Sequence, residues 1–304
     1  MKPSRAFGGQ GADRIILKSV GWMIVSCLMF ATVMACVRLF LTELPTEQSV
    51  FLRYFLGVFL LLPFVWQRIP ILISTPHRGR FILRFILHGL GVYTWFYSIL
   101  KIPLADVNAL LNLGPIYATL GGVLLFGEKL KFRRIMAILV SFVGALIVIK
   151  PGFTVINLGT VAILLTAPLF AFSDLIAKDL KTYHDDNLII FALSMGIAGM
   201  LFFPALLVWR QMVAWEWVGV LAISLCATIG HIALMKALRG PMWAAQSGKY
   251  IQLVFVVSYG MILFDEIPAA STLIGAVVVC SAVTYIAVRE SRIKANKPPI
   301  HPIG

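Results

Sequence analysis

Runs of mostly apolar residues alternate with short polar segments along the whole chain. An α-helix needs about 20 such residues to cross the hydrocarbon core of a bilayer. Lipid offers no hydrogen-bond partners, so backbone N–H and C=O groups must pair within each segment, which favours helices. The pattern predicts ten transmembrane helices, at Val20–Leu41, Ser49–Trp66, Phe81–Leu100, Ala105–Phe126, Ile135–Ile149, Leu158–Ala177, Leu188–Trp209, Trp217–Met235, Met242–Phe264 and Ser271–Val288.

The composition indicates an all-α integral membrane protein. Hydrophobic residues make up 60% of the 304 residues and charged residues 13%, with a mean hydropathy of +0.93. Soluble domains average roughly 45–50% apolar and about 25% charged residues. The longest polar segments are the tails 1–19 and 289–304, which leave no room for an extramembrane catalytic domain. The first apolar run lacks a small-residue cleavage site, so we expect a retained helix rather than a signal peptide.

The basic residues predict the orientation of the chain. A net charge of +13 is compatible with nucleic-acid binding, but these residues are scattered through short segments between apolar runs, as topology signals are. With a cytoplasmic N-terminus, 20 of the 26 Lys and Arg residues lie on the inner side. The outer segments hold only Lys101, Lys150 and Arg210, and Arg38, Arg53 and Lys249 fall within spans. We therefore expect both termini in the cytoplasm, an even number of spans and no nucleic-acid partner.

The two halves of the sequence resemble each other. A shift of 138 residues aligns Leu100–Pro103 with Leu238–Pro241, and Leu125–Glu128 with Leu263–Glu266. Five helices per repeat is an odd number, so the second copy enters the membrane from the opposite side. Inverted repeats of this kind are a recurring transporter plan, with a substrate site near the bilayer midplane. We expect a tail at 1–19, repeats at 20–150 and 151–288, and a second tail at 289–304.

Several kinds of chemistry are absent from the sequence. Cys27, Cys36, Cys226 and Cys280 all lie within apolar runs and show no CxxC spacing, so we expect free buried thiols. No Walker sequence, GxGxxG, HExxH or Ser/His/Asp constellation occurs. These observations predict no metal, no cofactor, no catalytic residues and no ATP-driven step within this chain.

Motifs in both halves resemble the EamA family of the drug/metabolite transporter superfamily. The run Phe96–Ala105, with sequence FYSILKIPLA, is similar to a stretch of that family, as is Pro115 followed by Phe126-Gly127-Glu128. The second half carries a similar series, and other elements of the resemblance are Arg53 with Gly57, Tyr250, Leu263–Pro268, Leu273–Ala276 and the Arg289-Glu290 ending. In this order and at these spacings, the resemblance covers nearly the whole chain. The sequence differs from the family pattern at Asp265, where Gly is usual.

The resemblance implies a fold and a class of function. Helices one to four and six to nine would surround a central cavity, and helices five and ten would pack at the periphery. Members of the family carry amino acids, nucleotide-like compounds such as S-adenosylmethionine, riboflavin, opine-type metal carriers and drugs, so the family does not fix the substrate. It also implies the inner membrane of a bacterium.

Ionisable residues within a bilayer are costly and are therefore functional candidates. Arg53 is either an anion-attracting or gating charge or a snorkelling residue at the interface. Lys249 lies deeper, where snorkelling is harder, and is interpreted as facing the cavity. Asp174 is a candidate for proton coupling, or else a partner of Lys249 or a helix-end residue near Lys178. Arg38 is interpreted as interfacial.

Neutral polar and aromatic residues extend the candidate site. Asn108 and Asn112 are four residues apart and share a helix face. The 138-residue shift aligns them with Gln246 and Tyr250, as expected for a midplane site between two facing helices. Interhelical hydrogen bonding is the structural alternative. The same shift aligns Tyr93 with His231, and these two residues and Trp95 are either substrate contacts or packing and interface residues.

The leading interpretation is a secondary transporter, an exporter or facilitator of a small organic metabolite such as an amino acid derivative, nucleoside-like compound or vitamin. An uptake carrier for a vitamin or an S-adenosylmethionine-type compound is the alternative within the same class. A lipid-modifying enzyme would need acidic or His residues clustered at one interface, where only Asp265 and Glu266 are found. A non-transporting scaffold would need no polar cavity. We expect a small-molecule substrate, the bilayer as the other partner, and a monomer or homodimer.

Overall fold

The computed structural model describes residues 10–114, 116–117, 120, 132–150, 157–237 and 251–295. Over these ranges the chain is helical and contains no β-strand. The elements are α1 (Gln10–Phe40), α2 (Thr46–Val65), a 3-10 turn η1 (Trp66–Arg68), α3 (Ile69–Ser74), α4 (Arg78–Lys101), α5 (Leu104–Leu111), α7 (Phe132–Ile149), α8 (Leu158–Leu180), α9 (Asp186–Leu207), α10 (Ala214–Ala237), α12 (Ile251–Phe264) and α13 (Ala270–Ala295).

The helices coincide closely with the predicted spans. Every predicted span other than the fourth and the ninth matches one helix, with ends that agree to within three residues, except that α1 begins ten residues earlier and α13 ends seven residues later than predicted. The fourth and ninth spans extend into residues outside the described ranges. Five segments are long and apolar enough to cross a membrane by length and composition, namely Leu17–Phe40, Thr46–Ser74, Leu158–Leu180, Asp186–Leu207 and Ala214–Ala237. Shorter apolar helices occur at Ile138–Ile149, Ile251–Phe264 and Ala270–Ala282.

Helix α4 is long enough to span a bilayer although it is less apolar. Its 24 residues correspond to about 36 Å at 1.5 Å per residue. Polar side chains interrupt its apolar surface, including Arg84, His88 and Tyr93. These polar residues lower the hydropathy of α4, and two of them belong to the site described below.

Local sequence signals set where several helices begin. The side chain of Asn157 accepts a hydrogen bond from the N–H of Thr160 at 2.9 Å, and Asp185 accepts from Asn187 and Leu188 at 3.1 and 3.2 Å. Such caps pair N–H groups that have no partner within the helix. Pro103, which has no N–H, separates α4 from α5 and forms the N-terminal boundary of α5.

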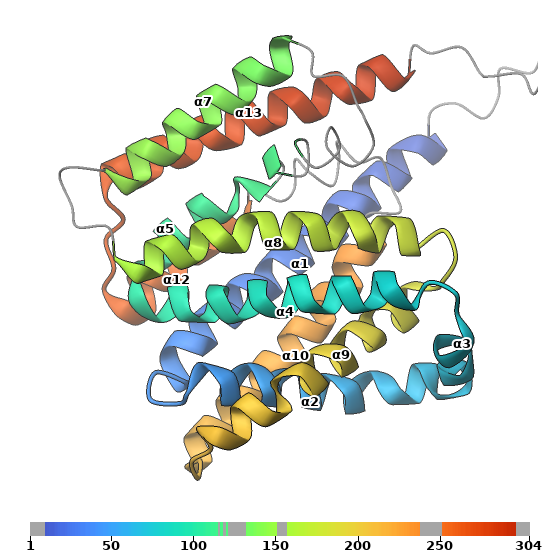
Figure 1. The fold of residues 1–304 in the computed structure, drawn as a ribbon. Coiled ribbons are helices and arrows are strands. Elements are labelled where there is room, and N and C mark those ends of the chain that lie inside the picture. Colours follow the sequence, from blue (N-terminus) through green and yellow to red (C-terminus); the bar gives the residue numbers. More distant parts are fainter. Residues whose placement is uncertain are drawn as a thin grey trace, which may run out of the picture.

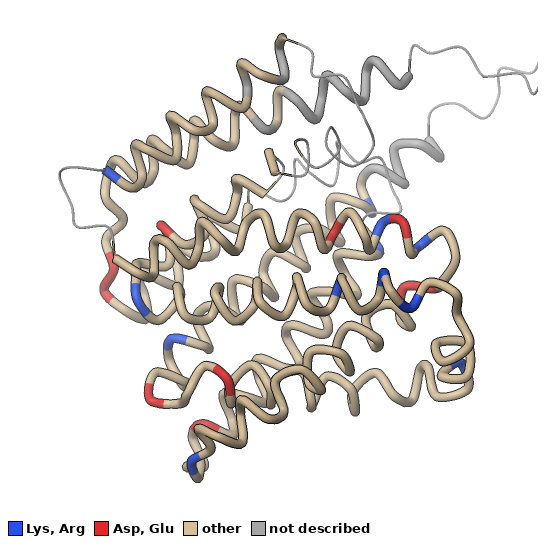
Figure 2. The backbone as a smooth tube through the Cα atoms, in the orientation of Figure 1, with Lys and Arg blue, Asp and Glu red and all other residues tan. Residues whose placement is uncertain are grey.

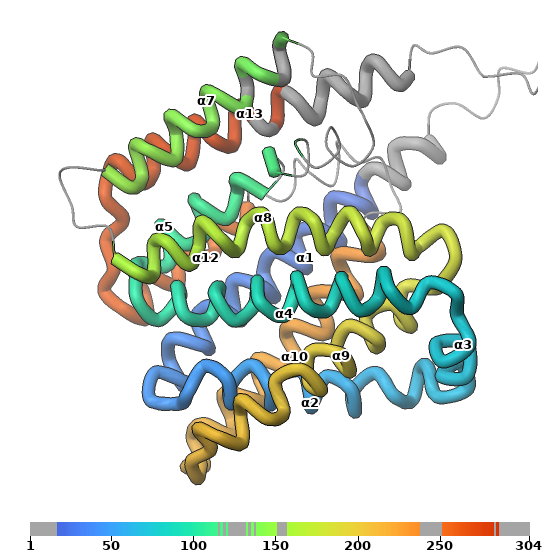
Figure 3. Tube along the Cα trace, in the orientation of Figure 1, coloured from blue at the N-terminus to red at the C-terminus, as the bar shows by residue number. Residues whose placement is uncertain are grey.

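Helices that are distant in sequence pack side by side. The most extensive contacts pair α1 with α10, α4 with α8, α2 with α9, and α7 with α13. The colours of Figure 3 show this interleaving of early and late segments. Figure 1 shows α7 and α13 together at one edge of the bundle and α2, α9 and α10 at the opposite edge.

Glycines allow some of these helices to approach closely. A Cβ atom at Gly275 of α13 would lie 2.5 Å from the carbonyl oxygen of Gly144 in α7. A Cβ atom at Gly91 of α4 would lie 2.7 Å from the ring of Phe170 in α8. Small residues at helix interfaces are typical of membrane bundles, where association depends on close packing rather than on the hydrophobic effect.

The polarity of the surface is that of a bilayer protein. Large apolar side chains face outward along the helices, among them Phe59, Phe203, Leu207 and Ile262. Figure 2 shows most of the charged residues gathered near the two ends of the helices. We name these ends after one residue each, the Glu266 end and the Asp179 end. An apolar outer surface between two charged ends is what a multi-pass membrane protein presents.

Candidate functional site

Buried polar side chains gather between α2, α4, α8 and α10. We call this set the central cluster, and it comprises Arg53, Tyr54, Arg84, His88, Ser173 and His231, all of which are buried. Arg84 and His88 are four residues apart on α4, so they project from the same face of that helix. Burial separates these side chains from bulk water in this conformation.

Arg53 is the most unusual member of the central cluster. Its side chain comes from α2 and is only 6% exposed. The guanidinium carbon lies 3.7 Å from the centre of the Tyr54 ring, close enough for a cation–π interaction. No residue in the described part of the chain accepts a hydrogen bond from the Arg53 guanidinium group.

Arg84 is buried beside the same tyrosine. One of its terminal nitrogens donates to the carbonyl oxygen of Ile189 at 2.9 Å, while Nε is buried without a hydrogen-bond partner. The charge of Asp174, on α8, acts on Arg84. The hydroxyl group of Tyr54, which is also buried without a partner, lies within the electrostatic reach of both arginines.

Two histidines complete the cluster. The ring centroids of His88 and His231 are 5.9 Å apart. His88 Nδ1 lies 3.2 Å from the hydroxyl oxygen of Ser173, and His231 Nδ1 donates to the carbonyl oxygen of Ala227 at 2.8 Å. Because Nδ1 of His231 carries the hydrogen, Nε2 of the neutral ring is a hydrogen-bond acceptor.

Aromatic rings flank the histidines. Phe170 stacks on His88 at 4.8 Å between centroids, and Phe30 contacts His231 edge-on at 5.0 Å. Trp95 is buried against Phe170 at 6.2 Å, and its indole nitrogen has no hydrogen-bond partner. The cluster therefore combines cationic and hydrogen-bonding groups with apolar walls, as small-molecule sites commonly do.

The structure brings some of the predicted site residues together and separates others. Arg53 and His231 belong to the central cluster, Asp174 lies beside it, and Trp95 borders it through Phe170. Tyr93 instead donates a hydrogen bond to Glu47 at 2.9 Å, nearer the Glu266 end.

The asparagines belong to a different part of the bundle. Asn108 and Asn112 are buried on and just after α5, where Asn108 Nδ2 has no partner and Asn112 Nδ2 lies 3.9 Å from the sulfur of Cys280 in α13. They stay candidates for a polar site between helices, without a contact to the central cluster. Gln246, Lys249 and Tyr250 lie outside the described residues.

Four members of the central cluster were not predicted as site residues, namely Tyr54, Arg84, His88 and Ser173. Arg84 is one of the 20 basic residues assigned to the inner side, although it is buried within α4. The four-residue spacing of Arg84 and His88 inside a predicted span was the signal that could have found them.

Arg38, in the last turn of α1, lies at the Glu266 end of the bundle. Its side chain is 14% exposed and forms an ion pair with Glu266. It also donates to the carbonyl oxygens of Ile99 and Ile102, at 2.7 Å from Nε to Ile99. The other oxygen of Glu266 accepts from the N–H of Leu104 at 2.9 Å. Arg38 therefore joins α1 to the ends of α4 and α12.

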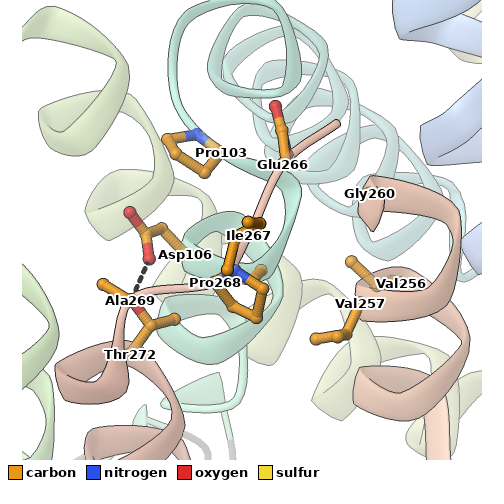
Figure 4. A pocket seen from close by; sticks show the side chains of 11 residues that line it. Pro103, Asp106, Val256, Val257, Gly260, Glu266, Ile267, Pro268, Ala269 and Thr272 are labelled. Carbon is orange, nitrogen blue, oxygen red and sulfur yellow. Dashed lines mark hydrogen bonds between the residues drawn. The ribbon is translucent and has the colours of Figure 1, made fainter. Parts of the chain in front are cut away.

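A pocket of about 180 Å³ opens beside this ion pair. Its lining includes Pro103, Asp106, Glu266 and Thr272. In Figure 4 the side chains of Asp106 and Thr272 point toward each other across one side of the pocket, joined by a hydrogen bond of 2.6 Å. This pocket lies at the Glu266 end and is separate from the central cluster.

Contacts at each end tie early helices to late ones. At the Glu266 end, the amide of Gln48 donates to the carbonyl oxygen of Arg210 at 2.9 Å, and Arg210 pairs with Glu216. At the Asp179 end, Arg80 pairs with Asp179 at 2.6 Å and Arg68 with Asp185 at 2.8 Å.

Histidines near the Asp179 end add to these ties. His184 Nε2 lies 3.1 Å from the hydroxyl oxygen of Thr75, and the ring of His77 stacks on Tyr183 at 4.1 Å. Within the described ranges, no group of three or more His, Cys, Asp or Glu side chains is arranged to hold a metal ion.

Comparison with known proteins shows similarity to transporters. The profile of the EamA-like transporter family matches residues 17–150. A pseudopaline exporter of Pseudomonas aeruginosa is 26% identical over 85% of this chain and 92% of its own length. The first half of the chain thus matches the EamA-like transporter family. The chain is also 23% identical to an S-adenosylmethionine uptake transporter of Rickettsia felis, over 94% of this chain and 98% of that protein.

Further comparisons give similar results. A riboflavin transporter of Vibrio cholerae is 23% identical to this chain over 91% of this chain and 95% of the relative. One solved crystal structure shares the fold, with a TM-score of 0.56 at 14% identity over 93% of this chain and 99% of the other. The apolar helices and the similarity to transporters support a multi-pass membrane protein.

Proposed function

We propose that this protein is a secondary transporter that moves a small organic metabolite across the bacterial inner membrane by alternating access. The observation that carries the proposal is the central cluster, because buried cations and histidines within a bilayer are costly unless a substrate uses them. The full-length relatives are named as transporters of pseudopaline, S-adenosylmethionine and riboflavin. They differ in substrate and direction, so both export and uptake stay open for this chain.

Two inverted five-helix repeats, residues 20–150 and 151–288, make up the proposed ten-helix architecture. Shifting α1 by 138 residues gives a range that overlaps α8, and shifting α4 gives a range that overlaps α10. The repeat therefore relates α1 to α8 and α10 to α4, and both α1–α10 and α8–α4 are packed pairs. It also relates α2 to α9 and α7 to α13, and the two helices of each of these pairs pack against each other. This reciprocity supports a two-fold axis relating the halves.

The end contacts support a gating mechanism. Each end has ties between the two halves, Arg38 to Glu266 and Gln48 to Arg210 at one end, Arg80 to Asp179 and Arg68 to Asp185 at the other. Rocking of one half against the other would break the ties at one end while keeping those at the other, which exposes the cluster alternately. The excess of Lys and Arg assigns the Asp179 end, the N-terminal tail and the C-terminal tail to the cytoplasm.

Asp174 is the proposed site of proton coupling. It lies beside Arg84 and is exposed, so a proton can reach it. If the carboxylate binds and releases a proton in each cycle, Asp174→Asn should leave transport active but insensitive to collapse of the pH gradient by a protonophore. A protonophore effect in the variant as large as in the wild type would remove this role.

Transport is tested by untargeted metabolite profiling of cells and medium, with and without expression of the protein. We expect at least one metabolite whose ratio between cell and medium changes with expression. No change in any metabolite, with the protein present in the membrane, would favour the scaffold alternative. The inverted repeat is tested separately by reporters on the C-terminal tail and within residues 150–157, which should lie on opposite sides of the membrane.

A further inference from the structure

Arg53 carries a buried positive charge that no carboxylate in the described part of the chain neutralises. Asp174 is the acidic residue whose charge acts on the cluster, and it acts on Arg84. Most other described acidic side chains are engaged elsewhere: Glu266 with Arg38, Glu216 with Arg210, Asp179 with Arg80, Asp185 with Arg68, Asp186 with Lys181, Asp106 with Thr272 and Glu47 with Tyr93.

A cation–π contact cannot offset the burial of this charge. The free-energy cost of removing a guanidinium group from water is far larger than the stabilisation that one cation–π interaction provides. Without a bound anion, burial of the Arg53 charge therefore stays energetically unfavourable despite the contact with Tyr54. A negatively charged group that enters the cluster would be bound by the charge and by all the unused N–H groups of the side chain.

Other unused hydrogen-bonding groups surround Arg53. The Tyr54 hydroxyl group and Arg84 Nε are both buried without partners, and both belong to residues whose electrostatic fields overlap that of Arg53. An oxyanion accepts hydrogen bonds from N–H and O–H donors, and the planar fork of arginine matches two oxygens at once. Phe30 and Phe170 provide apolar contact against the two histidines of the cluster.

We propose that Arg53, assisted by Tyr54 and Arg84, binds an oxyanion group of the transported metabolite, so that the substrates of this protein are organic anions. The inference rests on the proposed transport function and adds the chemical class of the substrate. With two arginines and one nearby aspartate, the cluster has one positive charge in excess among the described residues. A single carboxylate or phosphate ester on the substrate would balance it.

The test combines metabolite profiling with substitutions of Arg53. Cells expressing the wild type, Arg53→Gln, Arg53→Lys or Arg78→Gln are compared at equal membrane levels of protein. Arg78 is exposed and outside the central cluster, so it is the matched control. We expect the metabolites moved by the wild type to carry a carboxylate or a phosphate ester, which accurate mass distinguishes.

Arg53→Gln should reduce their movement roughly tenfold or more, because a charged hydrogen-bond partner is lost. Arg53→Lys should retain part of the activity, since it keeps the charge but not the fork, and Arg78→Gln should match the wild type.

The outcomes separate the two proposals. If the wild type moves only neutral or cationic metabolites, the transport function stands and the anion site is wrong. If it moves anions and Arg53→Gln moves them equally well, the anion site is also wrong. If no metabolite responds to the wild type, the transport function itself fails. The class of metabolite is read from the wild type alone, so an Arg53→Gln variant that fails to fold does not obscure the result.

Discussion

The carboxylate of Glu266 bridges the guanidinium group of Arg38 and the backbone N–H of Leu104. The ion pair joins residues 228 positions apart in sequence and links α1, α5 and the loop after α12. Arg38 also donates to two carbonyl oxygens near the end of α4. A single pair of side chains therefore fixes the arrangement of several helices at the Glu266 end.

Glu266→Gln should destabilise the protein by about 1–3 kcal/mol, because it leaves the partly buried Arg38 without its counterion. Arg68→Gln removes a more exposed ion pair, with side chains 52% and 35% exposed, and should cost less than about 1 kcal/mol. Thermal unfolding of the two purified variants in the same detergent checks the difference. Equal losses would mean that burial of the Arg38–Glu266 pair does not determine its contribution.

Two glycines on α9 differ in their surroundings and provide a matched pair. A Cβ atom at Gly196 would lie 2.3 Å from the ring of Phe85, with the Phe85 Cβ atom also at 2.8 Å, whereas a Cβ at Gly199 meets nothing within 4 Å. Gly196→Ala should therefore destabilise by about 1–3 kcal/mol through overpacking of α4 against α9. Gly199→Ala should be neutral or stabilise by up to about 1 kcal/mol. Similar unfolding curves for both variants would contradict this packing.

The span positions could be predicted from the sequence because runs of apolar residues are a local signal. The pairing of α1 with α10 and of α4 with α8 could not, since it depends on which surfaces fit together across the bundle. Arg84 shows the limit for the site. A cation near the start of a span is usually a topology signal, and only the three-dimensional structure shows it buried beside Tyr54. Arg53 was found because, together with Gly57, it also belongs to the resemblance to the EamA family.

Asp265 occupies the position where Gly is usual in the family, and its backbone φ angle is 53°. The loop thus keeps the left-handed conformation that glycine adopts without a steric cost. Asp265→Gly should leave the stability unchanged or raise it slightly. Asp265→Val should lower it by about 1–2 kcal/mol, since a β-branched residue strongly disfavours positive φ. Thermal unfolding checks both, and a Val variant as stable as the wild type would show that the loop can relax.

Protonation of His184 should loosen the contact between the loop after α8 and the segment before α4. Burial, together with the charge of His77, lowers the pKa of His184 below its ordinary value of 6.5, while Asp185 opposes the shift. The unfolded chain therefore binds a proton more readily than the folded one. This contribution favours the folded loop above about pH 6.5 and is lost as the pH falls toward the lowered pKa.

Hydrogen–deuterium exchange of residues 179–186, measured at pH 7.5 and pH 5.5 and corrected for the intrinsic pH dependence of exchange, tests this prediction. We expect protection of that segment to decrease at the lower pH in the wild type, because protonation places a positive charge on a partly buried ring next to His77. The decrease should be smaller in His184→Gln. Residues 208–213, which contain no histidine, provide the internal control at the opposite end. If the His184→Gln variant loses protection as much as the wild type does, another group is responsible for the pH dependence.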